Sequence, residues 1–365
     1  MQSGLVSVMM PAYNAEAFIG QAIESVLAQT NTYWELIIID DGSSDRTGQI
    51  ASQYGDPRIR IIRQENQGEA AARNIALKNI QGEFLAFLDA DDLYLPHHLE
   101  VTTGYLQMNI QADGVYTDGY YIDQIGNQLQ TLSSRRRGPF EGNLFEEVVY
   151  SSDVFGPPAC VVLRTGPIDG YGLKFDENIV IGPDWDFFTK YADVGEFGYL
   201  DQITCHYRLH TTNISVRTSL ERRALELAKC RMNAVQMRNF GNCSIGVRTA
   251  VFYDLLVNLL LDFPDRQSEF TYQSEFTKLP NREQAKLLRL MAGKTMIHGK
   301  DWSHVRNWLD RAWKLNPVDW RAALLCMLIR IHPELLHTLL KVKGIYDADM
   351  RLIPPFADLQ MSDHR

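Results

Sequence analysis

Three carboxylates follow a short apolar run in the first hundred residues. Residues 84–88 (FLAFL) lead directly into Asp89, Asp91 and Asp92. An unbroken apolar run is typical of a buried strand, and ligands of open α/β sheets bind just beyond the carboxyl ends of strands. Carboxylates this close together can hold a divalent cation with the help of substrate phosphates. The spacing predicts a metal and phosphate site, although an acidic turn without a ligand would show the same pattern.

Two other runs have the same design. Residues 35–39 (ELIII) are followed by Asp40 and Asp41, and residues 5–10 (LVSVMM) lead to Tyr13. Apolar residues recur at helical spacing between these two runs. The order strand, helix, strand predicts a right-handed crossover and a parallel sheet. The strand ends would then meet at one edge, where an aromatic ring and carboxylates suit a base, a ribose and a diphosphate.

Taken in order, these segments resemble a known family. The strings VSVMMPAYNAEAFIGQAIESVLAQT, WELIIIDDGSSDRT and NQGEAAARNIALKNIQGEFLAFLDADD are similar to family 2 of the inverting nucleotide-sugar glycosyltransferases. The resemblance is specific because several ordered blocks carry it, and it continues weakly to residue 216. It implies a GT-A fold, which is an α/β, Rossmann-like, mainly parallel sheet flanked by helices. An α-helical C-terminal region is expected to follow.

The resemblance implies a site for a nucleotide-sugar donor. The aromatic residue of the first block stacks on the base in the family, and here it is Tyr13, with the backbone of Pro11 and Ala12 close to the nucleoside. Asp41 would accept a hydrogen bond from the base. A carboxylate can accept the imide N–H of uracil, which favours a UDP-sugar, but guanine also carries N–H donors. The other nucleotide-binding candidates are Arg73 (for which packing or a salt bridge is an equal explanation), Asp89 and Ala90.

The family also implies a metal. Asp91 of the DxD motif would ligate Mn²⁺ or Mg²⁺, which neutralises charge on the departing diphosphate. Asp92 is expected to cap the next helix. The block HYRLH, followed by Asn213 and Ser215, resembles the YRxHxxNxS ending of many members. His210 in this block is a second candidate ligand, because imidazole binds Mn²⁺ beside carboxylates, although a histidine at a strand end is more often simply hydrogen-bonded.

An inverting transfer needs a general base for the acceptor hydroxyl. The family supplies it from an acidic motif at the start of a helix, and Asp184 in PDWDFF occupies that position. Members commonly have Glu-Asp there, whereas this chain has Pro183-Asp184. Trp185 and Asp186 would line the acceptor or sugar pocket. In the alternative interpretation Asp184 only caps the helix and Asp186 is a surface charge.

Length and composition fit two domains. The chain has 365 residues, 45% of them hydrophobic, enough for two sizeable cores. The pattern becomes helical near residue 219. We therefore expect a catalytic domain over 1–218, with a nucleotide-binding half (1–110) and an acceptor half (111–218), followed by a helical region over 219–365.

Charge and cysteine content limit the partners and the location. A net charge of −9 argues against a general nucleic-acid binder. Residues 280–345 nevertheless contain 12 Lys and Arg against 5 Asp and Glu. This region could contact an anionic membrane surface, form a homodimer or simply be solvated. Five scattered cysteines, with no signal peptide or membrane span expected, predict a cytoplasmic protein, at the inner face of the membrane if its helices bind lipid.

The expected function is a metal-dependent, inverting transfer of a sugar from a nucleotide diphosphate to a hydroxyl of a glycan or lipid-linked acceptor, as in polysaccharide biosynthesis. One alternative is a catalytically inactive GT-A-like binding module. Another is a sugar nucleotidyltransferase, which would be expected to carry a glycine-rich basic loop where this chain has PAYNAEAF. A dinucleotide oxidoreductase is disfavoured because no GxGxxG follows the first strand.

Overall fold

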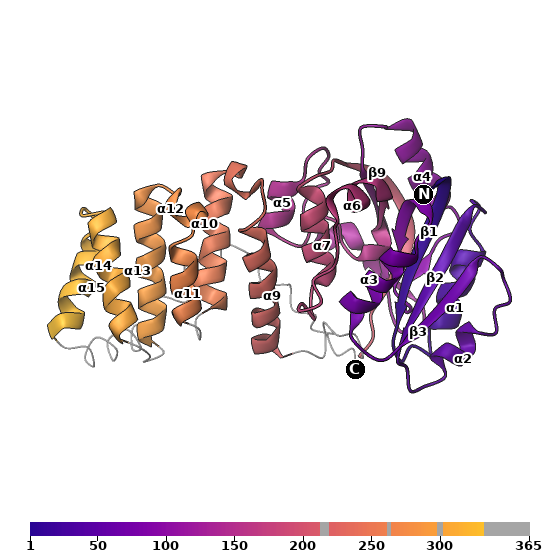
Figure 1. The fold of residues 1–365 in the computed structure, drawn as a ribbon, viewed down its shortest axis with the longest axis horizontal. Coiled ribbons are helices and arrows are strands. Elements are labelled where there is room, and N and C mark those ends of the chain that lie inside the picture. The colour runs from indigo at the N-terminus through magenta and orange to yellow at the C-terminus, as the bar shows by residue number, and fades with distance from the viewer. Residues whose placement is uncertain (212–218, 261–263, 298–301, 332–365) are drawn as a thin grey trace. The chain divides into compact units, whose positions relative to one another are not determined.

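The chain divides into two compact units, Met1–Thr218 and Ser219–Arg365. The division falls where the sequence pattern becomes helical. In the computed structural model (Figure 1), every residue is described except 212–218, 261–263, 298–301 and 332–365.

A mixed sheet forms the centre of the first unit (Figure 1). The described strands are β1 (Gln2–Ala12), β2 (Trp34–Asp41), β3 (Ile59–Gln64), β4 (Gly82–Phe87), β5 (Leu93–Tyr94), β6 (Gly114–Ile122), β7 (Gln128–Thr131), β8 (Val161–Arg164) and β9 (Phe197–Arg208). They lie in the order β3-β2-β1-β4-β8-β6-β9-β5, and β7 pairs with β6. Strands β1 to β4 are parallel, as predicted, whereas β8 runs antiparallel to both β4 and β6.

The register of the parallel strands brings their ends together. All eight residues of β2 are buried, as an apolar strand covered on both faces requires. Ala12 lies opposite Asp40 in the β1–β2 ladder, and Met9 lies opposite Phe87 in the β1–β4 ladder. The segments that follow β1, β2 and β4 therefore emerge side by side at one edge of the sheet.

Helices cover the sheet and connect its strands. The described helices of this unit are α1 (Ile19–Leu27), α2 (Thr47–Ala51), α3 (Glu69–Asn79), α4 (His98–Met108), α5 (Phe145–Tyr150), α6 (Thr165–Tyr171) and α7 (Pro183–Ala192), with short 3₁₀ turns at Leu132–Arg135 and Pro158–Cys160. Helix α3 packs on β1 and β2, α4 packs on β6 and β9, and α5 packs on α7. Buried alanines allow α3 to lie close to the sheet.

The stacked rings of Tyr94 and His98 support the end of β4. The hydroxyl of Tyr94 donates to the carbonyl of Phe87 (2.6 Å), and the Tyr94 ring stacks on the ring of His98 at 3.9 Å. The prediction that Asp92 caps the next helix is wrong. Helix α4 begins at His98 with no side-chain cap, and Asp92 instead accepts the backbone N–H of Arg208 (2.9 Å).

The buried His98 makes the stability of this unit depend on pH. Burial lowers the pKa of His98 to about 3. Its folded pKa lies below the ordinary value, so the stability it contributes is lost as pH falls from about 6.5 toward 3. Between pH 7.5 and 5.5 we expect wild type to lose about 1.4 kcal/mol relative to His98→Gln. Hydrogen exchange of the α4 amides at the two pH values measures this difference, and an unchanged difference would contradict the neutral buried state.

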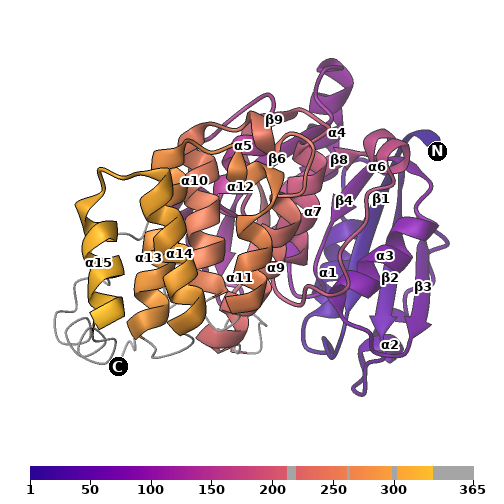
Figure 2. The ribbon, with the colours of Figure 1, turned by 60° about the vertical axis from the view of Figure 1, so that its left-hand side comes forward.

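The second unit is helical throughout its described part (Figure 2). Its elements are α9 (Leu220–Ala234), a 3₁₀ turn (Phe240–Asn242), α10 (Ile245–Tyr253), a π-helical turn (Asp254–Leu259), α11 (Pro264–Thr271), α12 (Ser274–Thr277), α13 (Asn281–Ile297), α14 (Trp302–Leu315) and α15 (Trp320–Ile331). Helix α13 packs against α10 and α14, and α14 packs against α15.

The described helices include only part of the region that was expected to contact a membrane. Within the described ranges, no helix combines the length and the apolar character needed to cross a bilayer. The basic region named above extends past Ile331 to residue 345, and that last part lies outside the described residues, as do Asn213 and Ser215. Contact with a membrane surface through these helices stays a prediction.

Candidate active site

The residues predicted to bind the nucleoside lie where β1 and β2 finish. Tyr13 follows β1 and is 54% exposed, so its ring is available for stacking on a base. Asn14 adopts a left-handed φ of 48°. Its side-chain oxygen accepts the backbone N–H of Ser44 (2.9 Å), and its own N–H donates to the hydroxyl of Ser43 (3.1 Å). These bonds fasten the loop after β1 to the loop after β2, with Pro11 and Ala12 directly before it.

Asp41 is held by the loop that precedes α3. Its carboxylate accepts the side-chain amide of Gln64 (2.6 Å) and the backbone N–H groups of Gln67 and Gly68 (both 2.8 Å). These three bonds hold the Asp41 carboxylate, which is only 3% exposed. Asp40 instead holds its own loop, because it accepts the N–H of Ser43 (3.0 Å). The predicted contact between Asp41 and the base stays a prediction.

Arg73 is buried beneath the DxD segment. Its Nη2 contacts Asp89 Oδ1 (2.7 Å) and Glu69 Oε1 (2.9 Å), and its guanidinium lies 5.5 Å from the centre of the Phe175 ring. The Nε and Nη1 atoms are also buried and have no hydrogen-bond partner. Arg73 therefore positions Asp89, which is the salt-bridge explanation left open by the sequence.

The neighbouring residue Asn74 forms hydrogen bonds with the segment before α7. Its side chain donates to the carbonyl of Phe175 (3.0 Å) and to Glu177 (2.8 Å), and accepts the N–H of Phe175 (2.9 Å). The Phe175 ring then stacks on Phe187 of α7 at 4.1 Å. This chain of contacts ties α7, which carries Asp184, to the helix beside the DxD segment.

Asp91 meets His210 across more than a hundred residues. Asp91 Oδ2 lies 2.7 Å from His210 Nε2, and the His210 ring lies 4.8 Å from that of Phe18. Arg208 braces the same place, because its Nε donates to the carbonyl of Asp91 (2.9 Å) and its Nη2 to Gln21 (2.8 Å). The structure thus brings together the two residues predicted as metal ligands, joined here by the hydrogen bond of the alternative interpretation.

The Asp91–His210 pair fits a divalent cation of the kind that is completed by its substrate. A carboxylate oxygen and an imidazole nitrogen at this separation can both turn toward one ion. Among the residues with described positions, no three His, Cys, Asp or Glu side chains gather as a metal-binding group. Within the described part of the chain, this pair would supply two ligands, and the others would come from diphosphate oxygens and water.

Asp184 lies in the first turn of α7, as predicted. The residue before the helix is Gly182 in a left-handed conformation, so Asp184 is not its cap. Asp184 is partly exposed. Its charge acts on Asp89 of the DxD segment. Burial raises the pKa of Asp89, Arg73 lowers it, and the charges of Asp91 and Asp184 raise it further.

The neighbours of Asp184 are more buried than the sequence predicted. Trp185 is almost buried and donates its indole N–H to the carbonyl of Val148 (2.8 Å). Asp186 is buried and pairs with Lys190 one turn later, so it is not the surface charge of the alternative interpretation. The assignment of both residues to the acceptor or sugar pocket stays a prediction.

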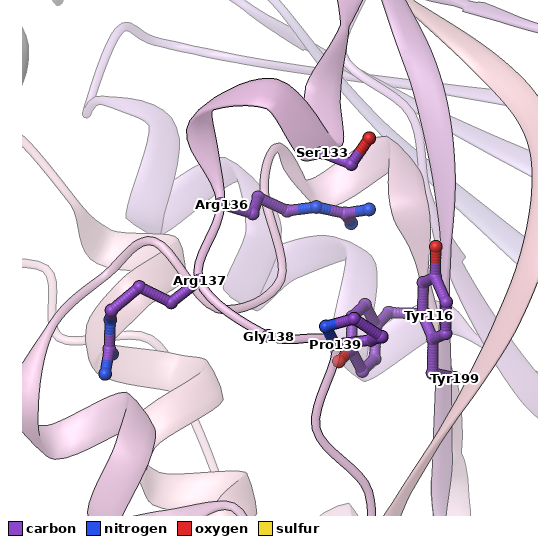
Figure 3. Close-up of a pocket in the computed structure, with 7 residues that line it drawn as sticks. All are labelled: Tyr116, Ser133, Arg136, Arg137, Gly138, Pro139 and Tyr199. Atoms are coloured by element: carbon purple, nitrogen blue, oxygen red, sulfur yellow. The ribbon is translucent and has the colours of Figure 1, made fainter.

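A second polar hollow lies elsewhere in the acceptor half (Figure 3). It is lined by Tyr116, Ser133, Arg136, Arg137, Gly138, Pro139 and Tyr199, and its volume is about 30 Å³. Arg136 donates to the carbonyls of Thr117 (2.7 Å) and Phe155 (3.0 Å) and pairs with Asp118 (3.2 Å). A space of this size is too small for a nucleotide sugar, and the contacts of Arg136 tie its loop to β6 and to the segment before β8.

Two residues of the site, Glu69 and Arg208, were given no role by the sequence analysis, and the buried environment of Asp92 was not predicted. Glu69 pairs with Arg73 one helical turn away, a spacing of four residues that could have suggested the contact. Arg208 lies inside the HYRLH block, but its contact with Asp91 joins distant segments. Asp92 is buried, and this burial raises its pKa well above the ordinary value, with the charges of Asp91 and Asp89 adding to the rise.

Comparison with known proteins adds to this geometry. The model of glycosyl transferase family 2 matches residues 7–168. An uncharacterized glycosyltransferase (RT0329) of Rickettsia typhi is 32% identical over 230 residues, which cover 61% of this chain and 70% of that protein. The chain belongs to glycosyl transferase family 2. The family predicted from the ordered motifs is thereby confirmed.

Another relative and a solved structure extend the comparison. The Escherichia coli protein WfgD, named a UDP-Glc:alpha-D-GlcNAc-diphosphoundecaprenol beta-1,3-glucosyltransferase, is 44% identical over 110 residues (30% of this chain, 44% of that protein). The crystal structure of S. aureus TarS 1-349 in complex with UDP-GlcNAc aligns with a TM-score of 0.56 and 18% identity, covering 87% of this chain and 92% of that one. The predicted fold class, GT-A-like with a helical C-terminal region, is confirmed.

The match to family 2 proteins has a limited extent in several cases. This chain spans only 26–32% of the length of four curated relatives that it matches. The activity, substrates and partners of the whole protein are therefore matters for proposal.

Proposed function

We propose that this protein transfers a sugar from a nucleotide-diphosphate donor, with UDP as the favoured nucleotide, to a hydroxyl of a glycan or lipid-linked acceptor. The observation that carries the proposal is the Asp91–His210 pair just after β4, and the charge of Asp184 acting on Asp89 of the same segment supports it. The donor named for TarS (UDP-GlcNAc) and the donor and lipid-linked acceptor named for WfgD support it.

Each residue has a defined part in the proposed reaction. Tyr13 and Asp41 would bind the base, while Arg73 orients Asp89 next to Asp91. Asp91 and His210 would hold Mn²⁺ or Mg²⁺, which supplies positive charge to the leaving diphosphate. Asp184 would take the proton of the acceptor hydroxyl as its oxygen attacks the anomeric carbon. The new bond forms on the face opposite the breaking bond to the diphosphate, so the configuration inverts.

Binding of nucleotides tests this proposal most directly. Calorimetry with UDP, GDP, dTDP, CMP and ADP, each with and without Mn²⁺, is expected to select one diphosphate, with Mn²⁺ tightening its binding. Asp91→Asn is expected to abolish the Mn²⁺ effect, because an amide oxygen is a weak neutral ligand. A loss of about tenfold or more in affinity corresponds to about 1.4 kcal/mol.

A matched variant controls for the change of charge. Asp169 is exposed near the end of α6, and Asp169→Asn should leave the Mn²⁺ effect intact. If no diphosphate binds, or if binding ignores both Mn²⁺ and Asp91→Asn, the transferase proposal is wrong and an inactive binding module becomes the better interpretation.

A further inference from the structure

The Asp91–His210 pair is supported by one buried guanidinium. The side chain belongs to Arg208, which is 2% exposed. Its Nε donates to the carbonyl of Asp91 (2.9 Å). The same guanidinium lies 5.0 Å from the centre of the Phe18 ring, and that ring lies 4.8 Å from the ring of His210. Arg208 therefore contacts the backbone of Asp91 directly and reaches the imidazole of His210 through one aromatic ring.

The guanidinium of Arg208 is also attached to helix α1 and to the loop after β6. Its Nη2 donates to the side-chain oxygen of Gln21 (2.8 Å), and its Nη1 donates to the carbonyl of Gln124 (3.1 Å). Gln21 lies in the first turn of α1, and Phe18 is the residue directly before that helix. A guanidinium is planar and holds its N–H groups in a fixed arrangement. The contacts with α1 therefore restrict where the Nε group can hold Asp91.

Packing of the core does not require the contact between Gln21 and Arg208. Helix α1 buries a different face, made of Ile19, Ala22, Ile23 and Val26. Gln21 is exposed, and Phe18 is only half-buried. Substitution of either residue should consequently leave the fold of the first unit in place, so that an effect on the Asp91–His210 pair can be measured by itself.

We propose that Phe18, Gln21 and Arg208 are positioning residues that set the affinity of the Asp91–His210 pair for a divalent cation. The inference rests on the proposed function, in which this pair holds Mn²⁺ or Mg²⁺. Groups that orient a metal ligand without touching the metal commonly change its affinity by about 10–100-fold. Arg208 holds the backbone of Asp91, while Phe18 orients the ring of His210. Gln21 keeps Arg208 in place.

Binding of Mn²⁺ alone to the full chain tests the inference without any substrate. Electron paramagnetic resonance follows the loss of the free-ion signal, and the site is identified as the one that Asp91→Asn weakens. Phe18→Leu keeps an apolar side chain but removes the ring, and it is expected to weaken Mn²⁺ binding about tenfold. Gln21→Leu is expected to weaken it about threefold, because water can replace part of the lost acceptor at an exposed position.

Two further glutamine variants separate positioning from a general disturbance. Gln21→Glu keeps an acceptor for Arg208 Nη2 and should bind Mn²⁺ at least as tightly as wild type does. Gln53→Leu makes the same change as Gln21→Leu at an exposed position just after α2, and should leave the Mn²⁺ affinity unchanged. Binding of UDP in the presence of EDTA should be equal in wild type, Phe18→Leu and Gln21→Leu, because no metal takes part in it.

The outcomes distinguish failure of the inference from failure of the proposed function. If Phe18→Leu and Gln21→Leu bind Mn²⁺ as wild type does, the inference is wrong and the proposed transfer stands. Equal losses in Gln21→Leu and Gln53→Leu, or a Gln21→Glu variant as weak as Gln21→Leu, also overturn the inference. If Asp91→Asn leaves Mn²⁺ binding unchanged while UDP still binds, the metal part of the proposed function fails together with the inference. Loss of UDP binding in wild type as well would reject the UDP-dependent transfer itself.

Discussion

Asp184→Asn is expected to lower kcat by about 10²–10⁴-fold, the usual contribution of a positioned general base. Asparagine has the same shape as aspartate but cannot take the proton of the attacking hydroxyl. Asp184 lies in the first turn of α7 and is partly exposed, so the substitution should leave the fold unchanged. Release of the nucleotide diphosphate from the donor measures the effect, with either the acceptor or water as the attacking group.

Donor binding separates a catalytic defect from a structural one. The Kd of the donor should change little in Asp184→Asn, because the diphosphate and the base bind elsewhere. Asp169→Asn serves again as the control and should keep the wild-type kcat. Turnover by Asp184→Asn at the wild-type rate would remove Asp184 as the base and leave another group to accept the proton.

Arg73→Met is expected to destabilise the first unit by about 3–5 kcal/mol, the effect of removing one partner from a buried ion pair. Methionine would fill part of the space but would leave Glu69 and Asp89 without their shared cation. Burial already raises the pKa of both carboxyls, so they would take up protons more readily without Arg73. The loss of stability should therefore be larger at pH 8 than at pH 6.

Hydrogen exchange of the α3 and β4 amides measures this change within the first unit alone. Arg46→Met is the matched control, since Arg46 pairs with Glu16 in an exposed position (3.1 Å), and such pairs contribute about 0–1 kcal/mol. If the two variants lose equal stability, Arg73 does not hold Glu69 and Asp89 together as described.

Local patterns in the sequence predicted the parts of the fold that depend on them. Apolar runs identified β1, β2 and β4, and the order of these runs with helices indicated a parallel sheet. The helical spacing between the first two apolar runs corresponds to α1 (Ile19–Leu27). The antiparallel insertion of β8 between β4 and β6 was not predictable, because pairing between distant strands leaves no periodic signal in either one.

In the candidate site, too, features that depend on local patterns were predictable and contacts between distant segments were not. The ends of the strands placed Tyr13, Asp41 and Asp91 at one edge, and the structure has them there. Contacts that cross the chain, such as Asp91 with His210, were suggested only by the family resemblance. The prediction that Asp92 caps a helix failed because the N–H of Arg208, 116 residues later, competes for that carboxylate.

The hydrogen bonds of Asn74 to the segment before α7 limit how halves of related proteins can be combined into one chain. A hybrid joined near residue 110 would take its donor half from one protein and its acceptor half from another. The acceptor half would need residues equivalent to Phe175 and Glu177, because the Asn74 side chain donates hydrogen bonds to both. Without them, the segment carrying Asp184 would lose its attachment to α3. Under the proposed function, we expect such a hybrid to bind its nucleotide but to lose the transfer step assigned to Asp184.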